Sequence, residues 1–169
     1  MVHTPQGLRF IYIHHKNYSV MTNEELKQGG AYPSECTTVI VGSRMTADGS
    51  MILARSEDWN MSFAKNLEIY EDREEGPKEF VAQDSGFRCE LPREALGYTA
   101  LAPCHLRGSW GSAGYNTAGV GMSATESIFS SEKALAVDPL VKDGLAENSV
   151  FNIVLPYIRT AREGVSRLG

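Results

Sequence analysis

The stretch that decides the fold reads Cys-Thr-Thr-Val-Ile-Val-Gly over residues 36–42 and Met-Ile-Leu-Ala-Arg-Ser-Glu-Asp over residues 51–58. Between these segments lies Ala-Asp-Gly-Ser at 47–50, where Asp48 and Gly49 tolerate the positive φ angles that a tight hairpin requires. The flanking β-branched and long apolar residues predict two neighbouring strands that are buried on both faces. The pattern therefore places one thiol, one guanidinium and one carboxylate on adjacent strands.

Composition predicts a soluble globular protein of about one domain. The 169 residues are 42% hydrophobic and 22% charged, which is enough to build a core. The formal net charge of -5 and the isoelectric point near 5.4 disfavour nucleic acid as a partner, because nucleic-acid binders usually carry a basic face. Repeats, low-complexity segments and linkers that would indicate a second domain are missing from the sequence.

The cysteines indicate a reducing compartment. Cys36, Cys89 and Cys104 are odd in number and none is spaced as Cys-x-x-Cys, so neither a disulfide framework nor a zinc site is predicted. We expect Cys89 and Cys104 to be free thiols in the core or a loop. The apolar run at 8–13 is too short to span a membrane and lacks the features of a secretory signal. A cytoplasmic protein that does not contact a membrane is therefore expected.

Residues 1–35 are poorly patterned and are interpreted as a leader or propeptide. Met21 precedes a plausible short helix opening and could itself be the translational start. In that case residues 1–20 would be a gene-model artefact, and the functional domain would occupy residues 36–169.

From residue 36 onward, short apolar runs between turn residues predict strands, whereas residues 72–86 have the composition of a solvated loop. Apolar residues at helical spacing follow Val150. Thr160 and Glu163 then form a capping box that predicts a helix from about residue 161. Because this helix is under three turns long at Gly169, we expect the chain to be the front piece of a longer protein. The strand candidates are 36–42, 51–55, 67–71, 96–102 and 119–125.

Cys36 has two interpretations. A lone thiol before an apolar strand is commonly an inert buried cysteine. A cysteine that becomes the first residue of a processed chain instead carries its own general base, since a free α-amino group titrates near 7.7–8 and can accept the thiol proton. A catalytic histidine is then not required.

Arg55 and Asp58 also have two interpretations. Such a pair is usually a surface ion pair worth at most about 1 kcal/mol. At the end of the strand opposite Cys36, however, both can reach the same point. There the guanidinium would favour the thiolate and the carboxylate would orient the amine.

Asn116 lies in a glycine-rich segment, residues 114–125, that leads into a strand of small residues. Asparagine is common in such segments simply because it suits a β-turn. The functional alternative makes the Asn116 amide an oxyanion-hole donor, an effect that is typically worth about 10²–10³ in rate.

Taken together, these residues resemble the PepD-type dipeptidases, which are cysteine-nucleophile members of the N-terminal-nucleophile hydrolases. The resemblance covers essentially all of residues 36–169, and its specificity lies in the combination of motifs. The matching motifs are Cys36-Thr37-Thr38, Val41-Gly42, Asp48-Gly49-Ser50, Ala54-Arg55, Glu57-Asp58, Asn116, Gly119-Val120, Met122-Ser123-Ala124-Thr125-Glu126, Leu155-Pro156 and Thr160-Ala161-Arg162-Glu163.

The resemblance implies an α+β fold, a four-layer αββα sandwich that is incomplete in this chain. It also implies cysteine-dependent hydrolysis of dipeptides without a metal or an organic cofactor. Related penicillin V acylases and bile-salt hydrolases share an N-terminal cysteine followed by Arg-x-x-Asp. Cys36, Arg55 and Asp58 therefore receive the corresponding catalytic roles, and Asn116 is carried over as the oxyanion donor.

Two departures from the family pattern matter. These hydrolases begin their active chain at the cysteine, so residues 1–35 would have to be removed, for example by self-cleavage between Glu35 and Cys36. Family members are also longer, and the acylase relatives use a later Asn and Arg that would follow Gly169. The resemblance thus allows that the chain as given is incomplete and inactive.

Two alternatives to the dipeptidase remain open. One is a penicillin V acylase-like or bile-salt-hydrolase-like amide hydrolase that uses the same machinery on an acylated amine. The other is a catalytically silent product, secernin-like or truncated, that retains the fold. The partner expected from the first interpretation is a dipeptide substrate, and a homo-oligomer is left open.

Overall fold

The computed structural model describes residues 2–3, 9–13, 36–57, 64–83, 85–104, 111–125, 130–145 and 147–169. The chain folds into two compact units. Unit 1 comprises Met1–Ala64 with Thr125–Ser127, and unit 2 comprises Lys65–Ala124 with Ile128–Gly169. Among the described helices, none has the length and apolar character needed to cross a membrane.

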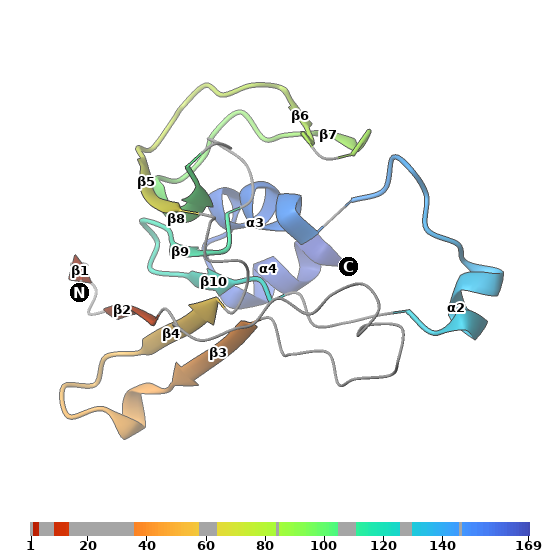
Figure 1. Cartoon of the computed structure of the whole chain (residues 1–169). Helices are drawn as coiled ribbons and strands as arrows, with labels where there is room; N and C mark the ends of the chain where they lie inside the picture. The colour runs from red at the N-terminus through yellow and green to blue at the C-terminus, as the bar shows by residue number, and fades with distance from the viewer. Residues whose placement is uncertain are drawn as a thin grey trace. The chain divides into compact units, whose positions relative to one another are not determined.

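Unit 1 contains a four-stranded sheet in the order β1-β2-β4-β3. Its strands are β1 (Val2–His3), β2 (Arg9–Ile13), β3 (Cys36–Val41) and β4 (Ile52–Glu57). β3 pairs antiparallel with β4, which pairs parallel with β2, and β1 is antiparallel to β2. The β3–β4 hairpin, drawn in orange, is the longest pairing in this sheet and carries the predicted nucleophile at the start of β3 (Figure 1).

The connection between β3 and β4 is held by its own polar groups. A single 3-10 turn, η1 (Ser43–Met45), follows β3. The Asp48 carboxylate accepts from the Ser50 backbone N–H at 3.2 Å and from its hydroxyl at 2.6 Å. Gly49 has φ +72, a conformation that a residue without a Cβ adopts freely. The positive φ predicted for this turn is confirmed.

The prediction that these strands are buried on both faces is wrong for β3. Val39 and Ile40 are 51% and 69% exposed. Val39 and Ile40 point to opposite faces of β3, and both lie close to the hairpin turn, where residues 42–45 are also exposed, so at this end of β3 both faces are uncovered. The apolar composition of residues 36–42 correctly predicted a strand, but composition alone does not predict whether other residues cover the strand.

The described residues of unit 2 form three two-stranded antiparallel sheets and a group of helices. Its strand pairs are β5 (Lys65–Tyr70) with β8 (Tyr98–Pro103), β6 (Glu79–Val81) with β7 (Arg88–Glu90), and β9 (Ala113–Tyr115) with β10 (Gly121–Ser123). Its helical elements are α2 (Glu132–Val137), α3 (Glu147–Val154), η2 (Leu155–Tyr157) and α4 (Ala161–Leu168). The mixture of helices and small sheets agrees with the predicted α+β class.

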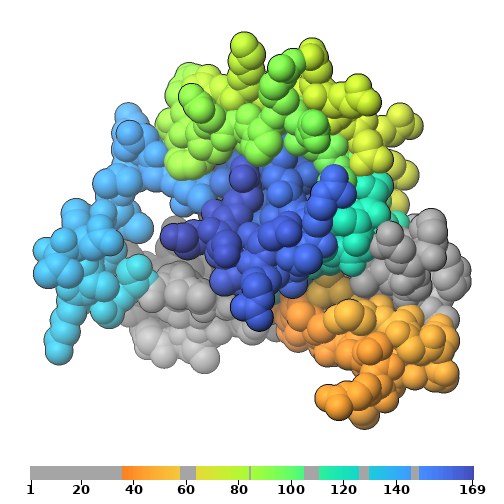
Figure 2. Space-filling model, turned by 180° about the vertical axis from the view of Figure 1, so that it is seen from behind, coloured from red at the N-terminus to blue at the C-terminus, as the bar shows by residue number. Residues whose placement is uncertain are grey.

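The core of unit 2 is centred on α3. Phe151 and Leu155 are fully buried and pack with Ala100 of β8, next to Tyr70 and Tyr98. The two tyrosine rings stack with their centroids 4.5 Å apart. Figure 2 shows α3 and α4 in blue bordered by the green segment that contains β6 and β7. The helix α2, in light blue, contributes no buried residue to this core.

Glycine allows β9 to approach β8 closely. A Cβ on Gly114 would lie 1.8 Å from the carbonyl oxygen of Thr99, which is far inside van der Waals contact. Ser112 donates its backbone N–H to the carbonyl of Leu101 at 2.9 Å in the same region. Close packing against β8 therefore requires glycine at position 114.

The capping box predicted the last helix correctly. The Thr160 hydroxyl accepts from the Glu163 N–H at 3.2 Å, and α4 begins at Ala161. The Glu163 carboxylate accepts from the backbone N–H of Arg159 at 2.6 Å, one residue before the expected position. The solvated-loop prediction for 72–86 was wrong in part, because β6 lies within it and pairs with β7.

Candidate active site

Cys36 and Arg55 are brought together by the register of the β3–β4 hairpin. Arg55 pairs with Thr38, so its side chain lies on the same face as those of Thr38 and Cys36. The Arg55 Nη2 donates to the Cys36 Sγ at 3.0 Å, across 19 residues of sequence. The contact predicted between thiol and guanidinium is thus present.

The surroundings of Arg55 strengthen its effect on the thiol. Arg55 is only 4% exposed, whereas Cys36 is half-buried and remains reachable from solvent. A guanidinium stays protonated in proteins, and its field is screened less when it is withdrawn from water. Such a cation beside a sulfur favours the thiolate over the thiol. The thiolate is the nucleophilic form.

The third member of the predicted constellation, Asp58, lies outside the described residues. The described carboxylate nearest to it in sequence is Glu57, which is half-buried and pairs directly with Cys36 in the hairpin register. Glu57 received no role from the sequence. Glu57 could have been found in the sequence from its two-residue spacing from Arg55, because residues two apart in a strand have side chains on the same face.

Asn116 lies in unit 2, where its amide is fully engaged by the backbone. It is 2% exposed, and its Nδ2 donates to the carbonyls of Leu155 at 2.9 Å and Ile158 at 2.7 Å. Its Oδ1 accepts from the Val120 N–H at 3.0 Å. The turn that it begins is closed by Gly119, at φ +80. These bonds support the turn interpretation, and the oxyanion role stays a prediction.

Cys89 and Cys104 have no disulfide partner, as predicted. Cys89 lies on β7 and packs against the cluster formed by Ile153, Val154 and Ile158. Burial raises the pKa of the Cys89 thiol, the direction expected of an inert cysteine. Cys104 is exposed.

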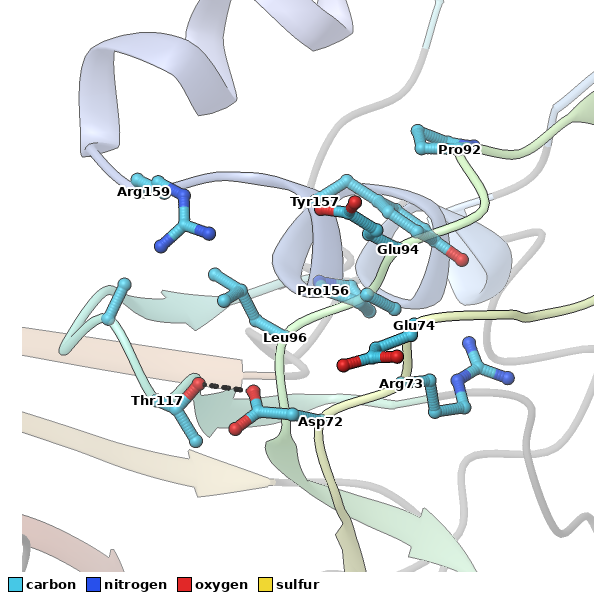
Figure 3. Close-up of a pocket in the computed structure, with 12 residues that line it drawn as sticks. Asp72, Arg73, Glu74, Pro92, Glu94, Leu96, Thr117, Pro156, Tyr157 and Arg159 are labelled. Atoms are coloured by element: carbon cyan, nitrogen blue, oxygen red, sulfur yellow. Dashed lines mark hydrogen bonds between the residues drawn. The ribbon is translucent and has the colours of Figure 1, made fainter.

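A separate pocket of about 740 Å³ opens on unit 2 (Figure 3). Its lining contains neither a thiol nor an imidazole. The Asp72 carboxylate accepts from the Gly97 N–H at 2.6 Å and the Thr117 hydroxyl at 2.8 Å, and these bonds, with the nearby Arg159 charge, lower the pKa of Asp72. The charged lining residues are Asp72, Arg73, Glu74, Glu94 and Arg159.

Asp72, one of the charged residues that line this pocket, has a structural role. Asp72 connects the turn at Thr117 to the segment at Gly97, both within unit 2, and Figure 3 draws its bond to Thr117 as a dashed line. The strongest chemical signal in the described chain is therefore the Cys36–Arg55 pair.

A sequence comparison identifies the family. The model of peptidase family C69 matches residues 35–169, and thus starts one residue before Cys36. The chain belongs to peptidase family C69. This membership confirms the resemblance drawn from the sequence motifs.

Curated dipeptidases are similar to the chain over 79% of its length. The probable dipeptidase B of Lactococcus lactis subsp. lactis is 42% identical over 135 residues, and the dipeptidase of Bifidobacterium longum is 42% identical over 148 residues. The probable dipeptidase of Salmonella dublin is 41% identical over 136 residues. The chain spans 28% of each of the first two relatives and 31% of the third.

Proposed function

We propose that this chain takes part in the cysteine-dependent hydrolysis of dipeptides, with Cys36 as an N-terminal nucleophile. The observation that carries the proposal is the 3.0 Å contact between the Arg55 Nη2 and the Cys36 Sγ. The names of the C69 relatives supply the substrate class. The proposal includes the four-layer αββα sandwich, removal of the segment before Cys36, and a cytoplasmic location consistent with free thiols.

In the proposed reaction the Cys36 sulfur attacks the carbonyl carbon of the scissile peptide bond. The free α-amine of Cys36 accepts the thiol proton and later protonates the departing amine. Arg55 favours the thiolate, and Asp58 orients the amine. Water then hydrolyses the thioester and releases the second product.

The developing oxyanion needs a hydrogen-bond donor. Asn116 remains the candidate from the family resemblance. For its Nδ2 to serve, one of the bonds to Leu155 and Ile158 would have to be exchanged for the substrate oxygen. The proposal therefore predicts a local rearrangement around η2 in the substrate complex.

Replacement of Cys36 tests the nucleophile. In the protein as its natural source makes it, Cys36→Ala should abolish release of free amino acids from a dipeptide panel, because the attacking sulfur is gone. Cys89→Ala is the matched control and should retain turnover, since that thiol is packed against the α3 core. Dipeptide cleavage by the Cys36→Ala protein at the unmodified rate would exclude the mechanism.

The same panel separates the two enzyme alternatives. Acylated amines, including a penicillin V-type amide, are offered beside free dipeptides at equal concentration. Preference for dipeptides is expected. Preference for the acyl-amides would replace the dipeptidase with an acylase, and no turnover by a protein whose N-terminus is Cys36 would favour the silent product.

A further inference from the structure

The proposed mechanism uses the α-amine of Cys36 as its base, but that amine exists only after the bond before Cys36 has been broken. While residue 35 is attached, the nitrogen of Cys36 is an amide, which cannot accept the thiol proton. The step that creates the amine therefore needs an acid–base group of its own. The inference that follows rests on the proposed function and concerns this earlier step.

The hairpin register places a carboxylate opposite the thiol. Cys36 pairs directly with Glu57, and Thr38 pairs with Arg55. Residues directly opposite in an antiparallel pair have Cβ atoms about 4.5–5.5 Å apart and side chains on the same face. The two further carbon atoms of a glutamate side chain can carry its carboxylate to either the sulfur or the nitrogen of Cys36.

The other charged group on this face is Arg55, which already donates to the sulfur. β3 is at the edge of the described sheet, so β4 is its one described neighbour. From β4, the residues that alternate onto the Cys36 face are Leu53, Arg55 and Glu57. The thiol thus faces one guanidinium and one carboxylate among the described residues.

We propose that Glu57 is the acid–base group for cleavage of the bond between Glu35 and Cys36. The Glu57 carboxylate accepts the Sγ proton, and the thiolate attacks the carbonyl carbon of Glu35. Glu57 then returns the proton to the Cys36 nitrogen as the C–N bond breaks. This leaves a thioester between Glu35 and Sγ and a free α-amine. Water hydrolyses the thioester to a Glu35 carboxylate and the Cys36 thiol.

The energetics suit a reaction that each molecule performs once. Ordinary carboxyl and thiol groups differ by about four pKa units, so the state with a neutral carboxylic acid and a thiolate is populated at about one part in 10⁴. The Arg55 guanidinium, 3.0 Å from the sulfur, raises that fraction. A single turnover tolerates such a population, whereas repeated catalysis benefits from the α-amine that the cleavage generates.

The test measures the mass of the purified full chain over time. The wild-type chain should lose residues 1–35, and Glu57→Gln should slow this loss by about 100-fold or more, the usual contribution of a positioned acid–base group. Glu57→Asp keeps a carboxylate and should process at an intermediate rate. Glu71→Gln removes an exposed carboxylate from unit 2 and is the matched control, with unchanged processing.

Circular dichroism checks that each variant folds. Processing of Glu57→Gln at the wild-type rate would overturn the inference, as would a folded Glu57→Asp chain that does not process at all. A wild-type chain that stays intact would also overturn it. Dipeptide hydrolysis is then measured on a wild-type chain produced with Cys36 as its first residue. Turnover by that chain would support the proposed function even if Glu57 has no role in processing. Failure of the Glu57 inference is therefore distinguishable from failure of the proposed function.

Discussion

At the scale of single residues, the proposed chemistry depends on Arg55, which the sequence motif identified but whose burial it did not predict. Arg55 alternates with Leu53 toward the covered face of β4, and both are buried. A buried cation requires electron-rich partners, and the Cys36 sulfur is one of them. The same hydrogen bond would therefore stabilise the Cys36 thiolate and partly compensate the buried charge of the Arg55 guanidinium.

Arg55→Gln should slow the reaction of Cys36 with iodoacetamide at pH 7 by about 10-fold or more, since an opposite charge this close commonly shifts a titration by one unit or more. The rate is followed by peptide mapping of the modified chain. Cys104 in the same sample is the internal control, because it is exposed and belongs to unit 2. An unchanged Cys36 rate in a folded variant would show that Arg55 does not activate the thiol.

At the scale of elements, Asn116 joins parts of unit 2 that are far apart in sequence. The turn after β9 is connected by two side-chain bonds to the carbonyls at the start and the end of the η2 segment. Pro156 lies inside that segment and cannot donate an N–H, so the chain there leaves the α-helical pattern. Asn116 supplies donors that the interrupted helix lacks.

Asn116→Ala should lower the free energy of unfolding by about 1–3 kcal/mol for each buried carbonyl left without its donor. Urea unfolding followed by circular dichroism measures the change. Asn66→Ala is the matched control, because Asn66 is exposed on β5 and its loss should have little effect. Equal urea midpoints for Asn116→Ala and Asn66→Ala would mean that the Asn116 amide does not stabilise η2. That result would favour the oxyanion role.

Local sequence signals predicted the elements whose cause is local. The capping hydroxyl of Thr160 located α4, and the Asp48-Gly49 pair located the turn before β4. The strand β6 was missed because it has only three residues and directly follows a charged stretch that resembles a loop, and its partner β7 supplies the pairing. For the site, the Cys36–Arg55 pair was predictable from two strands in register. The bonds of Asn116 were not, since its acceptors lie 39 and 42 residues away.

At the scale of the whole molecule, large apolar residues are exposed in both units, and those of unit 1 include part of a strand at the edge of the described sheet. Val39, Ile40 and Met45 are 51%, 69% and 81% exposed. They belong to β3 and the turn that follows it, at the edge of the described sheet. An edge strand with exposed apolar side chains is a template for another strand.

The purified chain should therefore self-associate as its concentration rises, and Val39→Lys should reduce this, because a lysine on an edge strand opposes strand pairing. Light scattering during size-exclusion chromatography gives the mass. Lys78→Arg is a control that leaves charge and unit 1 unchanged. A chain that stays monomeric at all concentrations, or a Val39→Lys chain that associates equally, would contradict this expectation.

The pairing of Cys36 with Glu57 also has a consequence for quality control. Side chains alternate along a strand, so a hairpin misaligned by a single residue would turn the sulfur away from both its guanidinium and its carboxylate. Under the proposed processing, a molecule with that error would keep residues 1–35, and Cys36 would not gain a free α-amine. Correct pairing of β3 with β4 would thereby be a condition for activation, and molecules with the wrong register would not hydrolyse surrounding peptides.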